Sequence, residues 1–252
     1  MIGRTAEPVD VLAFSPHPDD VELGCGGTLA SLARRGARFG IVDLTRGEMG
    51  TRGPPEVRAR EAAEAAGILG ARFRVSLDLG DGDLRTDRAA QRLVVDLVRR
   101  ARPRLVLAPL VSDRHPDHVR ASRLVSDAAW YAGLAKLETG LPAHRPDQVV
   151  FYAAYVLVTP SFLVDVSADF ETKLAAVRAY KSQFHAENPG ENPAEPETYV
   201  SSKGFFDGIE ARARALGRIA NVDYAEGFIS NVPPTLADPV AAFLGYEGGK
   251  KE

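Results

Sequence analysis

Cysteine and tryptophan are nearly absent from the sequence, with one of each among 252 residues. The single cysteine, Cys25, excludes an intrachain disulfide and any zinc site built from several cysteines, which fits a reducing compartment. Free cysteine is usually buried, so we expect Cys25 to be a structural residue of the core. Trp130 and its neighbour Tyr131 are also assigned to the core rather than to an interface.

Long apolar runs are missing as well. No stretch approaches the roughly 20 apolar residues that a membrane-spanning helix needs. The N-terminal segment MIGRTAEPVD has neither the apolar run nor the small-residue cleavage site of a signal peptide. We therefore expect a cytoplasmic protein with no membrane partner.

The chain also lacks a strong net charge, because 31 basic residues nearly balance 34 acidic ones. No long run of one sign appears, whereas a basic patch or tail is the usual feature of proteins that bind nucleic acid or a membrane surface. We expect no nucleic-acid partner. The remaining expectation is a small-molecule ligand for a chain whose 45% hydrophobic content can form a substantial core.

Short apolar runs alternate with helical patterns in the first half of the chain. The expected strands cover 9–14, 39–44, 72–77 and 104–110, and the expected helices cover 21–35, 56–69, 87–100 and 117–132. Strands that alternate with helices of this length predict right-handed crossovers and an α/β fold, with a Rossmann-like parallel sheet flanked by helices.

The second half is less regular and is expected to extend the same sheet, so that 1–252 form one domain. The elements expected there are a strand at 151–158, a short strand at 162–166 and a helix at 168–180. Segment 186–197 is rich in Pro, Glu and Asn and is interpreted as a surface loop, either a lid or a linker. The tail at about 245–252 is expected to be disordered.

Two short polar segments carry three of the five histidines. They are His-Pro-Asp-Asp at 17–20 and His-Pro-Asp-His at 115–118, and each directly follows a predicted buried strand. In a doubly wound sheet of order 3-2-1-4-5 these two strands are neighbours at the topological switch point, where ligands bind. A lone histidine there is more often a loop residue, and an aspartate is often a helix cap. Two such clusters meeting at one crevice favour a metal site.

The same segments resemble the motifs of a known family, the LmbE-like or PIG-L-like N-acetylglucosaminyl deacetylases. The resemblance rests on Ser-Pro-His-Pro-Asp-Asp-Val-Glu at 15–22 and Asp-Arg-His-Pro-Asp-His at 113–118, and it runs on through Tyr-Ala-Glu-Gly-Phe at 224–228. It is nearest to the branch that acts on N-acetylglucosaminyl malate in bacillithiol biosynthesis. Ser15 departs from the small Ala or Gly that is usual there, and we expect no consequence for the metal.

The resemblance implies a zinc-dependent enzyme that hydrolyses the N-acetyl group of an amino sugar, and a trimeric or hexameric assembly. The residue roles that it implies are His17, Asp20 and His118 as zinc ligands, Asp19 as general base, His115 as stabiliser of transition-state charge, Arg58 as sugar-binding residue and Tyr199 beside the developing oxyanion. Two imidazoles and one carboxylate leave positions open for water, and zinc lowers the pKa of such a water to about 7. Fe²⁺ or another divalent metal would fit the same ligands.

Other interpretations stay open at the level of sequence. The substrate could instead be a chitooligosaccharide, an inositol conjugate or another N-acetyl amino sugar. His17, Asp19 and His118 formally match the triad of a non-haem iron oxygenase, although the α/β alternation argues against that class. A non-catalytic metal- or sugar-binding protein is a further alternative. The glycines at 24–27, with Asp43 after the second strand, do not form a dinucleotide fingerprint and are expected to let the first helix pack closely on the sheet.

Overall fold

The computed structural model describes residues 6–184 and 196–235. Its seven strands form one sheet in the order β3-β2-β1-β4-β5-β7-β6. The strands are β1 (Val11–Ser15), β2 (Phe39–Asp43), β3 (Phe73–Ser76), β4 (Leu105–Pro109), β5 (Gln148–Tyr152), β6 (Phe162–Asp165) and β7 (Ala225–Ser230). The helices are α1 (Asp20–Arg34), α2 (Pro55–Leu69), α3 (Arg88–Ala101), α4 (Pro116–Ala132), the short 3₁₀ helix η2 (Ser167–Asp169), α5 (Phe170–Arg178) and α6 (Lys203–Ala220).

The first five strands form the predicted parallel sheet. β1 pairs with β2 on one side and with β4 on the other, so the strand order reverses between β1 and β4. This is the topological switch point that the sequence predicts, and the α/β fold is confirmed. The two polar segments follow β1 and β4 and therefore lie at the same edge of the sheet.

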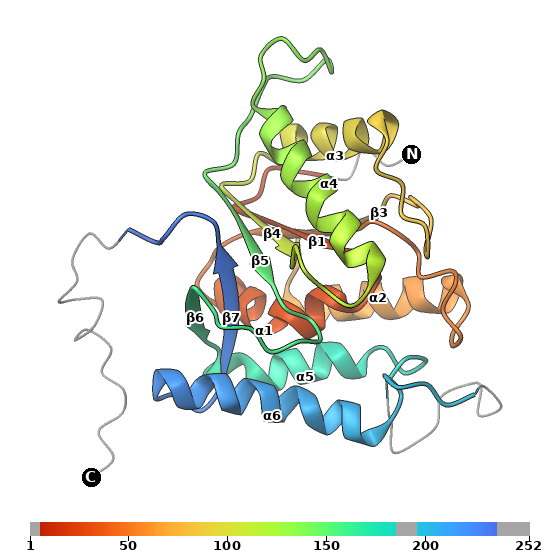
Figure 1. Ribbon diagram of the computed structural model, residues 1–252, viewed down its shortest axis with the longest axis vertical. Helices are drawn as coiled ribbons and strands as arrows, with labels where there is room; N and C mark the ends of the chain where they lie inside the picture. The colour runs from red at the N-terminus through yellow and green to blue at the C-terminus, as the bar shows by residue number, and fades with distance from the viewer. Residues whose placement is uncertain (1–5, 185–195, 236–252) are drawn as a thin grey trace.

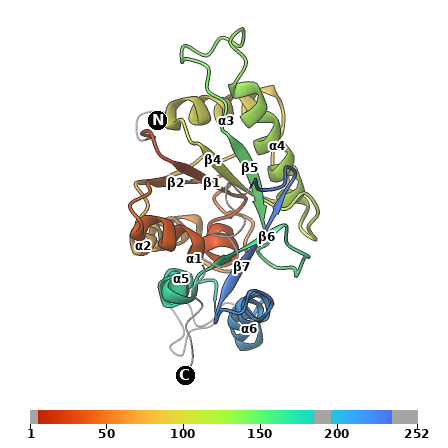
Figure 2. The same cartoon turned by 90° about the vertical axis from the view of Figure 1, so that its left-hand side faces the viewer.

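Helices cover both faces of the sheet, as Figures 1 and 2 show: α3 and α4 lie on one face, and α1, α2 and α5 lie on the other. Alternate residues of β1 enter the two cores. Val11 and Ala13 pack with residues of α1, α2 and α5, whereas Leu12 and Phe14 pack with residues of α3 and α4. A strand buried on both faces is the reason why this segment is a continuous apolar run.

The C-terminal half extends the sheet, as expected, but with antiparallel strands. β7 lies between β5 and β6 and is antiparallel to both. The strand predicted at 151–158 is wrong in its bounds, since β5 ends at Tyr152. β4 ends at Pro109, directly opposite Tyr152. Beyond Tyr152, a longer β5 would therefore have no residue of β4 to pair with. α6 and β7 have no counterpart among the predicted elements.

The remaining expectations about the fold have different outcomes. Cys25 is buried, as expected. The assignment of Trp130 and Tyr131 to the core is wrong, because their side chains are 62% and 38% exposed and Trp130 stacks on Arg145 at the surface. Most of the predicted loop 186–197 and all of the predicted disordered tail lie outside the described residues. Within the described ranges no helix is long and apolar enough to cross a membrane.

Candidate metal centre

The first polar segment forms a tight turn between β1 and α1. Ser15 fixes this turn, since its hydroxyl donates to the His17 carbonyl at 2.5 Å and accepts the Val21 N–H at 3.3 Å. Asp19 precedes α1 with φ 120°, a conformation that favours glycine and costs other residues on the order of 1–3 kcal/mol. Its carboxylate makes no capping hydrogen bond. Asp19 has a strained backbone and its side chain does not cap the helix, which indicates a role other than helix capping.

Three side chains from the two segments converge at the switch point. Single ligand atoms of His17, Asp20 and His118 lie within 4.8 Å of one another. Their side chains are 13%, 0% and 1% exposed. The His17 Nδ1 is 3.2 Å from Asp20 Oδ2, and the His118 Nε2 is 3.3 Å from the same oxygen. The structure therefore brings together the three residues that the sequence assigns to the metal.

The second nitrogen of each imidazole faces another carboxylate. The His17 Nε2 lies 3.1 Å from Asp81 Oδ1 and 3.4 Å from Asp117 Oδ2. The His118 Nδ1 lies 3.3 Å from Asp113 Oδ2. Carboxylates in this position fix the tautomer of a metal-binding imidazole and raise its basicity. Asp81 and Asp113 were not singled out from the sequence.

These carboxylates make the cluster favourable for positive charge. Desolvation lowers the pKa of His118, but Asp20 and Asp113 outweigh it and raise this pKa to about 9. The pKa of His17 is likewise raised well above its usual value, because Asp117, Asp20 and Asp81 outweigh the effect of burial. A field that favours cationic imidazoles also favours a metal cation bound to the neutral ones.

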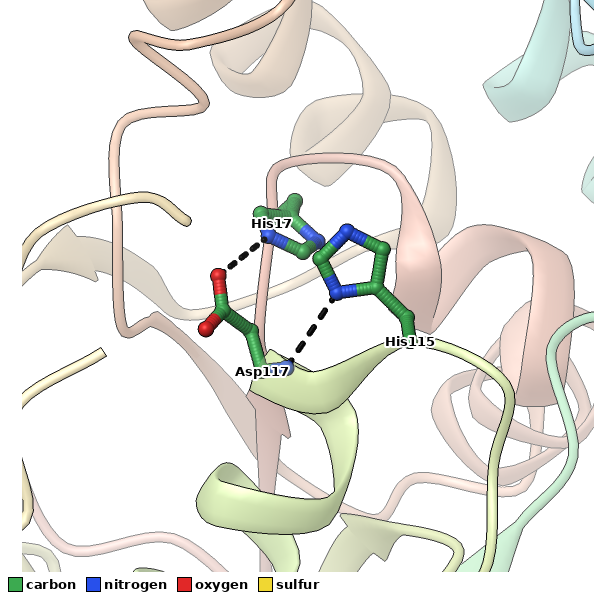
Figure 3. Close-up of side chains that lie close together, drawn as sticks. All are labelled: His17, His115 and Asp117. Carbon is green, nitrogen blue, oxygen red and sulfur yellow. Dashed lines mark hydrogen bonds and ion pairs between the residues drawn. The ribbon is translucent and has the colours of Figure 1, made fainter. Parts of the chain in front are cut away.

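A second group of potential ligands shares His17 and is drawn in Figure 3, where the rings of His17 and His115 lie side by side and Asp117 contacts both residues. Several of its polar atoms already have partners. The His115 Nδ1 accepts the Asp117 N–H at 3.2 Å, and the Asp117 carboxylate accepts the N–H groups of Gly82 at 2.7 Å and Leu84 at 3.2 Å. Asp117 thus orients His17 and anchors the loop after β3, while His115 is the residue that caps α4.

Asp20, in the first group, differs from the second group in having an oxygen atom without a hydrogen-bond partner among the described residues. Its Oδ1 is buried and accepts no hydrogen bond from residues 6–184 or 196–235. A buried carboxylate oxygen without a donor is costly, and a cation bound to it removes that cost. Two imidazoles and one carboxylate are also a typical zinc donor set. His17, Asp20 and His118 therefore fit a divalent metal better than the second group does.

Asp19 and Arg58 form a buried ion pair beside this cluster. An Arg58 Nη lies 3.1 Å from Asp19 Oδ2, and the guanidinium also donates to the Pro18 carbonyl at 2.7 Å and the Gly47 carbonyl at 3.1 Å. Burial raises the pKa of Asp19 to about 7, although the Arg58 charge opposes this shift. A carboxyl group with a pKa near neutrality is suited to accept and return a proton. The structure places Arg58 against Asp19, and its contact with a sugar stays a prediction.

His115 lies next to the cluster without joining it. Its ring centre is 4.8 Å from that of His17 and 5.2 Å from that of His118. Burial, and then the charge of these two imidazoles, lowers the pKa of His115, which favours its neutral form. Because its Nδ1 accepts the Asp117 N–H, the proton of the neutral ring is assigned to Nε2. His115 can therefore donate a hydrogen bond.

An aromatic group borders the other side of the cluster. The Tyr155 ring lies 5.6 Å from the His118 ring, and Phe205 lies 5.8 Å from Tyr155 and 5.4 Å from Tyr199. Tyr199 itself is 66% exposed, and its ring contacts are with Phe205 and Arg114 and not with the three ligands. Tyr155 was not predicted, since it falls in the stretch that the alternating pattern assigns to a strand.

Other residues of the first motif are structural. Glu22 is buried and pairs with Arg74 at 2.5 Å, and Arg74 also binds both carboxylate oxygens of Asp43 at 2.7 Å. Asp43 is therefore not available to a nucleotide ribose. An ideal Cβ on Gly24 would lie 2.1 Å from a ring carbon of Tyr152, so this position of α1 requires glycine. The close packing expected of the glycine segment is confirmed there.

Comparisons with known proteins agree with the geometry. The family model of GlcNAc-PI de-N-acetylase, PIG-L, matches residues 12–129, which include most of β1, all of β4 and both polar segments. The chain is 37% identical over 190 residues to the diacetylchitobiose deacetylase of Thermococcus kodakarensis, covering 69% of this chain and 70% of that protein. It is also 26% identical over 247 residues to the 4-oxalmesaconate hydratase of Pseudomonas putida, covering 88% and 89% of the two chains.

A solved structure extends the similarity over the whole fold. The crystal structure of the conserved protein TT1542 from Thermus thermophilus has 44% sequence identity and a TM-score of 0.81, and it covers 92% of this chain and 98% of that chain. The antiparallel half of the sheet is thus included in the match. The chain belongs to the PIG-L, or LmbE-like, family of deacetylases.

Proposed function

We propose that the protein is a metal-dependent hydrolase that removes the acetyl group from the nitrogen of an N-acetylglucosaminyl conjugate. The observation that carries the proposal is the buried cluster of His17, Asp20 and His118, with an outer carboxylate behind each imidazole and an Asp20 oxygen that lacks a donor. These three residues would hold the metal, with zinc as the first expectation and Fe²⁺ as an alternative. When bound, a divalent metal supplies a Lewis acid that polarises the amide carbonyl and activates water.

The residues around the cluster perform the proton transfers. Asp19, held by Arg58 and not used for capping, takes the proton from the attacking water and passes it to the leaving nitrogen. His115 donates its Nε2–H to the oxyanion of the tetrahedral intermediate. This is a hydrogen bond from a neutral ring, since its pKa is lowered. The family resemblance also assigns Tyr199 to the oxyanion, and this role stays a prediction.

The substituent on the sugar is the finer part of the proposal. We propose a malate conjugate, N-acetylglucosaminyl malate, because the family resemblance of the chain, carried by its segments 15–22, 113–118 and 224–228, is nearest to the branch that acts on it. The relative from Thermococcus kodakarensis acts on diacetylchitobiose, so a second N-acetylglucosamine is the alternative substituent.

The test is to load the purified protein with zinc and measure free amine and acetate from three compounds: N-acetylglucosaminyl malate, diacetylchitobiose and N-acetylglucosaminyl inositol. We expect release of one acetate per amine formed. The similarity to the 4-oxalmesaconate hydratase suggests the outcome that would contradict the proposal. If 4-oxalmesaconate is formed or consumed while no amide is cleaved, the proposal is wrong.

A further inference from the structure

An arginine beside the metal cluster has no role in the scheme above. Arg114 directly precedes His115, and its side chain is exposed. The guanidinium carbon lies 5.2 Å from the centre of the Tyr155 ring and 5.0 Å from the centre of the Tyr199 ring. The two tyrosines come from separate parts of the chain, the segment after β5 and the segment before α6. Arg114 is therefore held in place by two aromatic rings, each a favourable partner for a cation.

The charge of Arg114 is not neutralised by the described residues. Its acidic neighbour in the sequence, Asp113, is engaged elsewhere, because it accepts the His115 N–H at 2.9 Å and lies 3.3 Å from the His118 ring nitrogen. No ion pair joins Arg114 to a carboxylate of residues 6–184 or 196–235. An exposed guanidinium that is stacked but not paired keeps its hydrogen-bond donors available.

Arg114 is also close to the reaction centre. Tyr155, which contacts the guanidinium, has its ring centre 5.6 Å from the ring centre of His118, a proposed metal ligand. In a 2-acetamido glycoside, the anomeric carbon is bonded to the carbon that carries the acetamido group. When the acetamido group is at the cluster, the substituent on the anomeric carbon is only a few bonds away, on the scale of these contacts.

The chemistry of arginine then selects the kind of substituent. A planar guanidinium binds a carboxylate or a phosphate through two parallel hydrogen bonds, and it binds a neutral hydroxyl less strongly. Contact with two rings restrains the guanidinium before binding, which lowers the entropy cost of forming those bonds. On the basis of the proposed deacetylase function, we propose that Arg114 determines specificity by binding an anionic group, a carboxylate or phosphate, on the anomeric substituent of the substrate.

The experiment compares zinc-loaded wild type with Arg114→Ala and Arg114→Lys. The control is Arg123→Ala, which removes an exposed arginine from the surface of the neighbouring helix α4. The substrates are N-acetylglucosaminyl malate, N-acetylglucosamine 1-phosphate and the neutral methyl N-acetylglucosaminide. Acetate release is measured over a range of substrate concentrations at two ionic strengths.

We expect Arg114→Ala to lower kcat/KM for an anionic substrate by about 10- to 100-fold, mostly through a higher KM. For the neutral methyl glycoside, kcat/KM should change by less than about threefold. Arg114→Lys should recover part of the loss, and Arg123→Ala should match wild type. A loss confined to the malate conjugate identifies a carboxylate as the ligand, and a loss confined to the phosphate identifies a phosphate.

The inference would be overturned if Arg114→Ala lowered kcat/KM equally for the charged and neutral substrates. It would also be overturned if the wild type had no preference for an anionic substrate. Failure of the proposed function is a separate result. In that case the wild type cleaves none of the three amides, although it holds zinc.

Discussion

At the scale of single residues, the two adjacent carboxylates of the first motif differ in what surrounds them. Asp20 points an oxygen without a hydrogen-bond donor into the cluster, and Asp19 pairs with Arg58. We predict that Asp19→Asn keeps its metal but loses on the order of 10²–10⁴-fold in kcat, because an amide cannot accept the proton. Asp20→Asn should instead lose metal affinity. Metal content and single-substrate kinetics of both variants check this, and loss of metal from Asp19→Asn would reverse the two roles.

Arg58 offers a test of what its charge does. The positive charge of Arg58 lowers the pKa of Asp19, so its removal raises that pKa. As the pH falls, Asp19 then becomes protonated, and inactive as a base, at a higher pH. We predict that Arg58→Gln shifts the acidic limb of the kcat/KM profile to higher pH, with a lower kcat on that limb. A variant whose KM alone rises, with an unshifted profile, would show that Arg58 binds the sugar and does not tune Asp19.

Much of the site could be predicted from sequence, for a physical reason. His17, Asp20 and His118 follow buried strands whose apolar runs are easy to recognise, and the neighbourhood of those strands follows from the fold class. Asp81 could not be found in this way, because it lies in an irregular loop after β3 and reaches His17 through tertiary contacts alone. The ion pair of Arg58 with Asp19 was missed because the contact between helix α2 and the turn after β1 is tertiary, although both residues were singled out from the sequence.

At the scale of elements, helix α1 contains a break that other elements repair. Cys25 has the non-helical angles φ −144° and ψ 18°. After the break, the N–H groups of Gly27 and Thr28 donate to the Glu226 carboxylate of β7 at 3.0 and 2.7 Å. Before it, the Leu23 carbonyl accepts the Lys173 ammonium of α5 at 2.9 Å. The turn that carries Asp20 is thus tied to the C-terminal half of the chain.

Lys173 and Glu226 also pair with each other at 2.5 Å, and both side chains are 3% exposed. We predict that Lys173→Met lowers the free energy of unfolding by about 3–5 kcal/mol, because Glu226 keeps a buried charge without its cation. Urea denaturation measures this. Lys203→Met is the matched control, since it removes a lysine from an exposed ion pair with Asp207 on α6 and should cost little. Equal losses in the two variants would contradict the prediction.

The elements show where sequence patterns succeed and fail. The strands β1, β2 and β4 are buried on both faces and were predicted because their apolar runs are continuous. α6 was missed, and its sequence contains Gly204, Gly208 and Gly217, which weaken a helical pattern. β7 was missed because its buried residues include the charged Glu226. Its burial depends on Lys173, which no local pattern reveals.

At the scale of the whole molecule, the metal is expected to stabilise the fold, since it would bind the assembled cluster and not the unfolded chain. A metal at 100 times its Kd contributes about 2.7 kcal/mol. We predict that a chelator lowers Tm by several degrees and that zinc restores it. His118→Ala should abolish this change in Tm with chelator and zinc. His144→Ala should keep it, because His144 contacts the Pro103 carbonyl outside the cluster. A zinc response that persists in His118→Ala would place the metal elsewhere.

The trimer or hexamer implied by the family resemblance stays a prediction, as does the cytoplasmic location. The exposed Trp130 side chain and its Arg145 partner are the kind of aromatic and arginine contact that protein interfaces favour.

The place of β7 in the sheet has a consequence for biosynthesis. β6 pairs with β7 and with no other strand of the sheet, although β7 begins 60 residues after β6 ends. During synthesis from the N-terminus, β1 to β5 can assemble before β6 has a strand to pair with. β7 must then enter between β5 and β6 and bring Glu226 to the broken helix α1. A ribosome-stalled or truncated chain that ends before residue 225 would therefore hold all three proposed metal ligands and still lack the strand that completes their support.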